Sequence, residues 1–219
     1  MHKRLPLIDA TSAVCVLGLC LTLVFRVMGT GAQAADGQRL CTVDAVSGMA
    51  AEVAVDMGWQ PVGEGQPVPA DARIRTGADT RLHISCDDGI AVTIGTATEV
   101  SLNGLIGASG PDRNIGVRLM SGIAGFVAPQ HSWNKFEVAT EVAIASVRST
   151  EWLVESDSEG TTAIFTRRGR VDVLAGSTQL SLGAGEGVTV SADAIAAPVK
   201  VWSTARIAKA GEALGYNWK

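Results

Sequence analysis

The chain has 219 residues, of which 47% are hydrophobic and only 5% aromatic, and it carries 25 glycines and a formal net charge of −4. This length accommodates one domain or two small ones, and the glycine-rich, aromatic-poor composition suits short strands and turns better than a helical bundle. Nucleic acid is not an expected partner, because the one basic run, at 167–170, is typical of a solvated hairpin tip.

The first 34 residues have the pattern of a secretory signal peptide. Lys3 and Arg4 precede an apolar run at 10–25, and Ala32-Gln33-Ala34 offers a small-residue cleavage site. The alternative is an uncleaved membrane anchor, although the run is shorter than the roughly 20 residues that span a bilayer. We therefore expect cleavage after Ala34 and a periplasmic or secreted chain, with membrane attachment only if this segment is retained. The mature chain then holds 15 Lys and Arg against 21 Asp and Glu, a net charge of −6.

Two cysteines, Cys41 and Cys86, remain after removal of the signal peptide. In an oxidising compartment they predict one disulfide, which requires that the first mature strand lie beside the strand at 81–86. The alternative is two separately buried thiols. Zinc would need four ligands at recognisable spacing, which the sequence lacks, so we expect no metal and no cofactor.

From residue 38 onward the hydrophobic pattern has a period of two. Leu82, Ile84 and Cys86 alternate with polar residues, and Asp88-Gly89 predicts a hairpin turn before the next strand at 91–94. Similar short alternations recur at 100–102, 117–119, 171–173, 180–182 and 188–190. The pattern predicts an all-β domain at 35–198, with a polar surface loop at 103–114.

Three segments share a glycine followed by alternating small and apolar residues, which suggests successive hairpins stacked on one another. They are S-G-M-A-A-E-V at 47–53, S-G-I-A-G-F-V at 121–127 and R-G-R-V-D-V at 168–173. Their unequal spacing excludes a simple repeat array.

The tail at 199–219 interrupts the strand pattern. Ile207, Ala210 and Leu214 have helical spacing, which predicts a short helix interrupted by Gly211. The tryptophans at 202 and 218 flank this helix, and we expect both to dock it onto the β domain.

The sequence contains no convincing catalytic constellation. His83 is expected to face solvent, and His131 lies in a turn-rich loop without a nucleophile motif beside it. The glycine-rich string at 183–187 lacks the residues of a phosphate loop. The acidic groups at 87–88 and 155–159 lack the further ligands that calcium takes, and they suit turns and solvated loops better.

An ordered set of motifs resembles the FecR domain over roughly residues 43–190. The motifs are W-Q-P-V-G-E-G (59–65), I-R-T-G-A-D-T-R-L (74–82), D-D-G-I-A-V-T-I-G-T-A-T-E-V-S-L (87–102), L-M-S-G (119–122), F-E-V-A-T (136–140), S-V-R-S-T-E-W-L-V (146–154) and R-R-G-R-V-D-V (167–173). The resemblance implies an extracytoplasmic, β-solenoid-like stack of strands and hairpins. In the best-known members this domain follows a cytoplasmic anti-sigma region and a membrane helix, and senses a TonB-dependent transporter. Only nine residues precede the apolar run here, so we expect a stand-alone exported protein.

The hallmark Arg148, Thr150, Glu151 and Trp152 is interpreted as structural. In one regular strand, Arg148 and Glu151 would point to opposite faces. The family has glycine where this chain has Ser149, and a bulge there would return the two charges to the same side as a buried ion pair. Ligand binding by these residues is the alternative.

Three functions follow from these observations. The first is an exported, non-enzymatic binding or scaffold protein that recognises an envelope protein, peptide or glycan. The second is a regulator of signalling through a TonB-dependent transporter and a sigma factor. The third is a carbohydrate-active enzyme, which would need paired carboxylates in a cleft.

Overall fold

The computed structural model describes residues 41–55, 58–105, 112–129 and 133–215, all within the compact unit of residues 35–219. The predicted signal peptide, His131 and Trp218 lie outside the described residues. Within these ranges, no helix has both the length and the apolar character needed to cross a membrane.

Sixteen strands and one helix make up the described part of the chain, so the predicted all-β class with a short C-terminal helix is confirmed. In chain order they are β1 (Cys41–Ser47), β2 (Ala51–Val55), β3 (Gly58–Pro61), β4 (Arg73–Thr76), β5 (Arg81–Cys86), β6 (Ala91–Ile94), β7 (Glu99–Asn103), β8 (Asn114–Ala128), β9 (Lys135–Ala139), β10 (Ala143–Val147), β11 (Thr150–Ser156), β12 (Thr162–Arg168), β13 (Val171–Ala175), β14 (Thr178–Leu182), β15 (Glu186–Val190), β16 (Lys200–Val201) and α1 (Thr204–Leu214).

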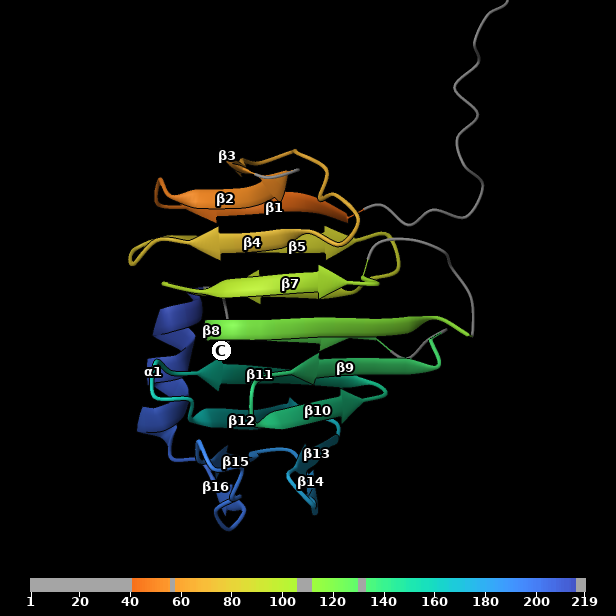
Figure 1. Ribbon diagram of the computed structural model, residues 1–219, viewed down its shortest axis with the longest axis vertical. Coiled ribbons are helices and arrows are strands. Elements are labelled where there is room, and N and C mark those ends of the chain that lie inside the picture. Colours follow the sequence, from red (N-terminus) through yellow and green to blue (C-terminus); the bar gives the residue numbers. More distant parts are fainter. Residues whose placement is uncertain (1–40, 56–57, 106–111, 130–132, 216–219) are drawn as a thin grey trace, which may run out of the picture. The chain divides into compact units, whose positions relative to one another are not determined.

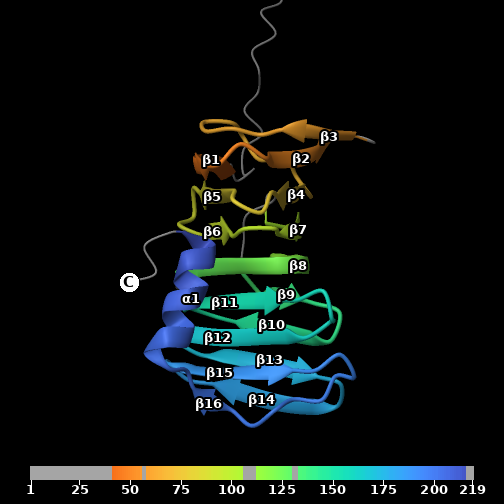
Figure 2. The ribbon, with the colours of Figure 1, turned by 90° about the vertical axis from the view of Figure 1, so that its left-hand side faces the viewer.

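The strands form two layers that share β8 (Figures 1 and 2). The first sheet has the order β1-β5-β6-β8-β11-β12-β15-β16, and the second has the order β3-β2-β4-β7-β8-β9-β10-β13-β14. β8 belongs to both because it changes layer near its middle. Ser121 still pairs with β7 of the second sheet, whereas Gly122 pairs with β11 of the first.

All strand pairs are antiparallel except β8 with β9. Hairpins alternate between the two layers along the chain: β5–β6 lies in the first sheet, β9–β10 in the second, β11–β12 in the first and β13–β14 in the second. The successive hairpins that the glycine pattern suggested are therefore present. Solenoid-like stacking, which the resemblance implied, is not confirmed.

The hydrophobic core lies between the two sheets and includes a group of aromatic rings. Trp152 of β11 stacks on Phe126 of β8 with ring centroids 5.0 Å apart, and meets Phe136 of β9 edge to face at 5.2 Å. All three side chains are fully buried. Aromatic pairs of this kind contribute about 0.5–1.5 kcal/mol beyond the burial of their surface. The buried role of Trp152 supports its interpretation as a structural residue.

Three glycines mark corners at which the chain changes sheet. Gly48, Gly122 and Gly169 have positive φ, a conformation that residues with a Cβ rarely adopt. A Cβ at each position would also overlap the neighbouring corner, which carries a buried threonine: Thr80, Thr98 and Thr150, respectively. These are the glycines of the three similar sequence segments, so that pattern marks changes of sheet.

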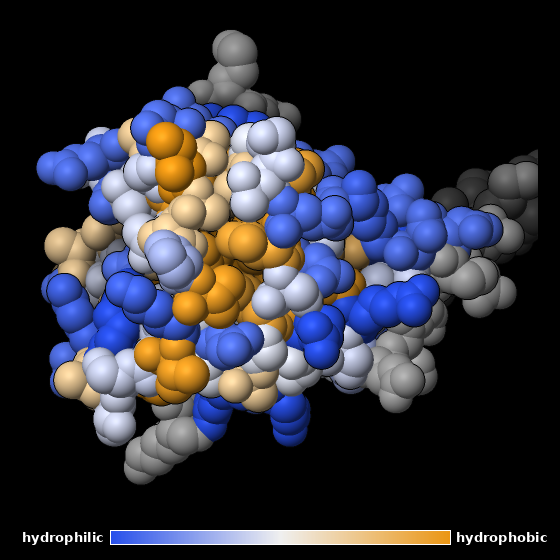
Figure 3. Space-filling view, turned by 90° about the horizontal axis from the view of Figure 1, so that it is seen from below, coloured by the Kyte–Doolittle hydropathy of each residue, from blue (hydrophilic) through white to orange (hydrophobic). Residues whose placement is uncertain are grey.

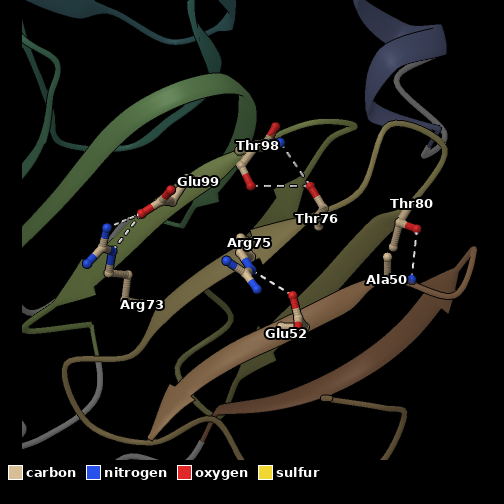
Figure 4. Close-up of polar contacts among 8 residues, drawn as sticks. All are labelled: Ala50, Glu52, Arg73, Arg75, Thr76, Thr80, Thr98 and Glu99. Carbon is tan, nitrogen blue, oxygen red and sulfur yellow. Dashed lines mark hydrogen bonds and ion pairs between the residues drawn. The ribbon is translucent and has the colours of Figure 1, made fainter. Parts of the chain in front are cut away.

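The corner threonines join each corner to its neighbour by hydrogen bonds. The Ala50 N–H donates to Thr80 Oγ1 at 3.1 Å, a contact visible in Figure 4. The Ile123 N–H donates to Thr98 Oγ1 at 2.9 Å, and Thr150 Oγ1 donates to the carbonyl oxygen of Arg170 at 2.9 Å. Backbone groups that leave a sheet at a bend would otherwise be buried without partners.

The C-terminal helix α1 packs on the outer face of the first sheet. Its Ala210 and Leu214 join a second apolar cluster with Ile123, Leu153 and Phe165. The helix begins at the N-cap Ser203 and ends at Gly215, whose left-handed conformation is typical of a C-cap.

The predicted interruption of this helix at Gly211 is wrong, because α1 continues through it to Leu214. Packing against the sheet offsets the cost of one interior glycine, which is about 1 kcal/mol. The predicted docking role of Trp202 is confirmed, since its ring stacks on Phe165 at 4.7 Å.

At the end where β14 and β16 are the last strands, apolar side chains gather on the surface (Figure 3). Leu180, Ala196 and Val199 pack against the core there and remain partly buried. They close the space between the sheets at this end.

Candidate binding surface on the second sheet

The disulfide between Cys41 and Cys86 is present. The two residues lie directly opposite each other on the antiparallel strands β1 and β5, with Cα atoms 4.0 Å apart. Both side chains are buried in the core. The predicted neighbourhood of the first mature strand and the strand at 81–86 is therefore confirmed.

The predicted pair of Arg148 and Glu151 is wrong. β10 ends at Val147 in the second sheet and β11 begins at Thr150 in the first, so Arg148 and Ser149 form the bend between the sheets. Side chains alternate regularly between two faces only within one strand. The bend interrupts this alternation, so Arg148 and Glu151 lie apart. Arg148 is exposed, whereas Glu151 lies on the outer face of the first sheet.

Glu151 has a different partner from the one expected. Its Oε1 accepts a hydrogen bond from Arg167 Nη1 at 2.9 Å. Glu151 pairs with Arg168 in the ladder while Trp152 pairs with Thr166, which makes Arg167 the extra residue of a bulge. The bulge therefore lies in β12 and not at Ser149. Ser149 avoids positive φ, as expected for a residue without the freedom of glycine.

A buried ion pair joins Arg113 to Asp88, and sequence reasoning missed it. Arg113 Nη1 lies 3.0 Å from Asp88 Oδ2, and the two side chains are only 5% and 6% exposed. Arg113 also donates to the carbonyl oxygens of Gly104 and Leu105. Burial lowers the pKa of Arg113, which reflects the cost of removing its charge from water.

The sequence explained Asp88 as a turn residue, and this explanation gave no reason to expect its second role as the partner of Arg113. Asp88 Oδ1 accepts from the Ile90 N–H at 3.1 Å, as expected for an Asp-Gly turn. The turn directs its other carboxylate oxygen toward Arg113. Arg113 itself lay at the edge of the predicted polar loop. No spacing rule connects two residues that are 25 positions apart.

His83 projects from the outer face of the first sheet, as predicted, but it does not face solvent. Its side chain is only 13% exposed, and Nδ1 lies 3.0 Å from Thr93 Oγ1. Burial lowers the pKa of His83, and the charge of Asp44, 3.8 Å from Nε2, partly opposes that shift. The expectation of a solvent-facing residue is wrong because neighbouring side chains, among them Thr93 of β6 and Asp44 of β1, leave little of the imidazole exposed.

The acidic groups considered as calcium ligands have structural partners. Glu155 forms an ion pair with Arg206 of α1, and Asp157 Oδ1 accepts from the N–H groups of Glu159 and Thr161. Within the described ranges no three His, Cys, Asp or Glu side chains are grouped so that they could hold a metal ion.

The outer faces of the two sheets differ in what covers them. On the first sheet, Ile123, Leu153 and Phe165 point outward yet are buried beneath α1. On the second sheet, strands β8, β9, β10 and β13 alternate between buried and partly or fully exposed residues. The described residues therefore leave the outer face of the second sheet open, and we call it the open face.

One end of the open face carries a ladder of charges across β2, β4 and β7 (Figure 4). Arg75 Nε donates to Glu52 Oε2 at 2.6 Å, and Arg73 Nε donates to Glu99 Oε1 at 2.7 Å. The hydrogen bond from Arg75 to Glu52 raises the pKa of Arg75. Trp59 of β3 adds an aromatic surface, because the Arg75 guanidinium lies 4.3 Å from its ring centroid. Arginine stacked on tryptophan is frequent at protein interfaces.

The other end of the open face carries a groove of about 390 Å³, which we call the corner groove. Its lining residues come from the ends of β9, β10 and β13 and from the bend after β10: Asn134, Lys135, Phe136, Ser146, Val147, Arg148, Arg170 and Asp172. Arg148, expected to pair internally, therefore lines a surface groove. This placement could not be read from the sequence because it depends on the change of sheet.

Comparison with known proteins finds a family match for part of the chain. Residues 72–177 match the family model described as FecR protein. The chain contains a FecR domain. The match begins just before β4 and extends just beyond β13. The FecR domain therefore includes the corner groove and most of the open face.

Two solved structures share the fold. Both are described as crystal structures of a candidate anti-sigma factor from Parabacteroides distasonis ATCC 8503. The first has a TM-score of 0.54 at 19% identity and covers 64% of this chain and 63% of that chain. The second has a TM-score of 0.52 at 19% identity and covers 62% of each. The chain thus spans less than two thirds of either neighbour, and at this identity the likeness concerns the fold alone. None of the curated proteins matches the sequence.

Proposed function

We propose that this chain is an exported FecR-domain protein with a regulatory role in signalling, and that it performs this role by binding a partner protein on its open face. The FecR domain and the fold shared with candidate anti-sigma factors support a signalling role that works through protein contacts. The observation that carries the proposal is the contrast between the sheets. The helix α1 covers Ile123, Leu153 and Phe165 on the outer face of the first sheet, whereas the second sheet presents an uncovered face with paired arginines and a tryptophan.

The proposal includes export and the absence of catalysis. The signal-like segment at 1–34 and the disulfide support an oxidising compartment, where disulfides persist. Within the described residues, the charged side chains singled out as possible catalytic or metal-binding groups have structural partners, such as Arg206 for Glu155. A direct role beside a TonB-dependent transporter and a sigma factor is the more specific form of this function, and the identity of the captured partner decides it.

Capture of the partner from the cell envelope tests the proposal. The tagged protein would be expressed in the organism that encodes it and cross-linked in intact cells. It would then be purified from the periplasmic fraction, and mass spectrometry would identify its partners. Arg118→Glu reverses an exposed charge on the open face, and Lys209→Glu makes the matched change on α1. We expect the first variant to lose the partner and the second to retain it. Equal recovery with both variants would exclude the open face as the binding surface, and recovery of a glycan alone would contradict a protein partner.

A further inference from the structure

The corner groove carries two arginines at the edge of the hydrophobic core. Arg148 and Arg170 line it beside Val147 and Phe136, whose side chains belong to the core, and Lys135, which also lines it, is paired with Glu137 at 2.8 Å. Arg148 and Arg170 come from neighbouring corners that Gly169 and Thr150 hold together. The backbone that carries the two arginines is therefore fixed by the fold.

The arginines of this groove lack the carboxylate partner that most other arginines of the described chain have. Arg73, Arg75, Arg113, Arg167 and Arg206 each form an ion pair with a carboxylate. Arg148 forms no hydrogen bond or ion pair with another described residue, and Arg170 donates only to Ser181 Oγ, at 3.1 Å. Two guanidinium groups thus keep most of their donors free at one surface site of an acidic protein. A guanidinium fork is suited to binding a carboxylate through two parallel hydrogen bonds.

The remaining polar residues indicate which kind of anion fits. Asp172 also lines the groove, and its charge opposes a ligand that is anionic along its whole length, such as a polyuronate or a polyphosphate. The same carboxylate accepts hydrogen bonds from peptide N–H groups. Asn134 Nδ2 donates one hydrogen to Asn114 Oδ1 and keeps a second, whereas the Ser146 hydroxyl donates to Glu137 Oε1. A polypeptide supplies amide groups, separate carboxylates and apolar side chains in one ligand.

We propose that the corner groove binds an acidic peptide segment of the partner protein. Arg148 and Arg170 hold its carboxylates, Asp172 and Asn134 bind its backbone amides, and an apolar side chain lies beside Val147 at the edge of the groove. This inference rests on the proposed function and extends it by naming the chemistry of the contact. The interaction is weakened by salt, because the guanidinium groups are exposed.

Fluorescence anisotropy with a labelled acidic peptide, acetyl-Glu-Leu-Glu-Leu-Glu amide, tests this inference on the mature chain. We expect saturable binding that Arg148→Gln and Arg170→Gln each weaken at least about tenfold, the loss of roughly one charge-assisted hydrogen bond. Lys209→Gln removes an exposed positive charge from α1, outside the groove and the open face, and is the matched control. It should leave the affinity within about twofold. Thermal melts of the variants confirm that each is folded.

Several results would overturn the inference. An equal loss of affinity in Lys209→Gln would mean that the peptide responds to overall charge. Competition by trigalacturonate or inorganic phosphate at the same concentration as the unlabelled peptide would reject peptide chemistry in favour of a general anion site. Absence of saturable binding would reject the groove as well. If capture of the envelope partner still depends on Arg118, the proposed function stands and only the corner groove is wrong.

Discussion

Replacement of Asp88 by asparagine should be among the most destabilising conservative changes in this protein. The amide side chain would keep an oxygen for the Ile90 N–H, so the turn would remain, but it would leave the Arg113 charge without its counter-ion. The Asp88 and Arg113 side chains are only 6% and 5% exposed, so water reaches the stranded guanidinium poorly. Breaking one side of a buried pair costs about 3–5 kcal/mol.

That magnitude is a large part of the roughly 5–15 kcal/mol that stabilises a typical domain. Exposed pairs on the same protein provide the contrast. Glu52 and Arg75 are 31% and 44% exposed, and an ion pair of this kind contributes about 1 kcal/mol or less. Glu52→Gln is therefore the matched control for Asp88→Asn, since each change replaces one carboxylate by its amide.

Urea unfolding of the wild type, Asp88→Asn and Glu52→Gln, followed by circular dichroism, measures the free energy of unfolding of each protein. We expect Asp88→Asn to lower the free energy of unfolding by about 3–5 kcal/mol and Glu52→Gln to lower it by less than about 1 kcal/mol. The double variant Asp88→Asn with Arg113→Met should regain part of the loss, because it also removes the stranded charge. Equal, small losses in both single variants would refute the reasoning that burial makes the Arg113–Asp88 pair essential.

Three further predictions rest on the structure and a fourth on the sequence. Cys41→Ser with Cys86→Ser should lower the free energy of unfolding by about 4 kcal/mol, because the disulfide joins residues 45 positions apart and so closes a long loop in the unfolded chain; thiol titration of the unfolded, unreduced wild type should find no free cysteine. Gly122→Ala should lower the free energy of unfolding by about 2 kcal/mol or more, since this residue has positive φ and a Cβ here would overlap Thr98. Gly116→Ala in the same strand, where a Cβ meets open space, should lower it by less than about 1 kcal/mol in the same denaturant assay. Burial lowers the pKa of His83, so the folded protein binds a proton at this residue less readily than the unfolded chain does. The contribution of His83 to the free energy of unfolding should therefore be complete above about pH 6.5 and decrease as the pH falls below it. In thermal melts, His83→Gln should show a smaller loss of stability than the wild type between about pH 7 and pH 5.5. N-terminal sequencing of the exported protein should begin at Ala35, and a mature chain that still starts near Met1 would contradict cleavage.

The sequence predicts those features that depend on local alternation. Cys86 shares a face with Leu82 and Ile84, and this was enough to place it in the core and to propose its partner. The Asp88-Gly89 turn and the helical spacing of Ala210 and Leu214 are equally local signals. Each reflects the periodicity of one element, which its own residues determine.

Features that depend on which sheet a strand joins could not be predicted in this way. The segment from Val147 to Val154 has strand-like residues throughout, so the change of sheet at Arg148 and Ser149 was not visible. The glycines of the three similar segments were the available signal, because glycine at positive φ permits such corners. The pair of Arg113 and Asp88 has no comparable signal, since only the arrangement of β6 and β8 brings it together.

Site-specific photo-crosslinking in the cell envelope tests the central claim, that the open face binds a partner protein. A photoreactive benzophenone residue would replace Ser101 on the outer face of β7 in one variant and Thr189, on β15 of the first sheet, in another. The account predicts that irradiation links one defined envelope protein to position 101 and not to position 189. Cross-links of equal yield at both positions, or a partner bound only through position 189, would contradict it.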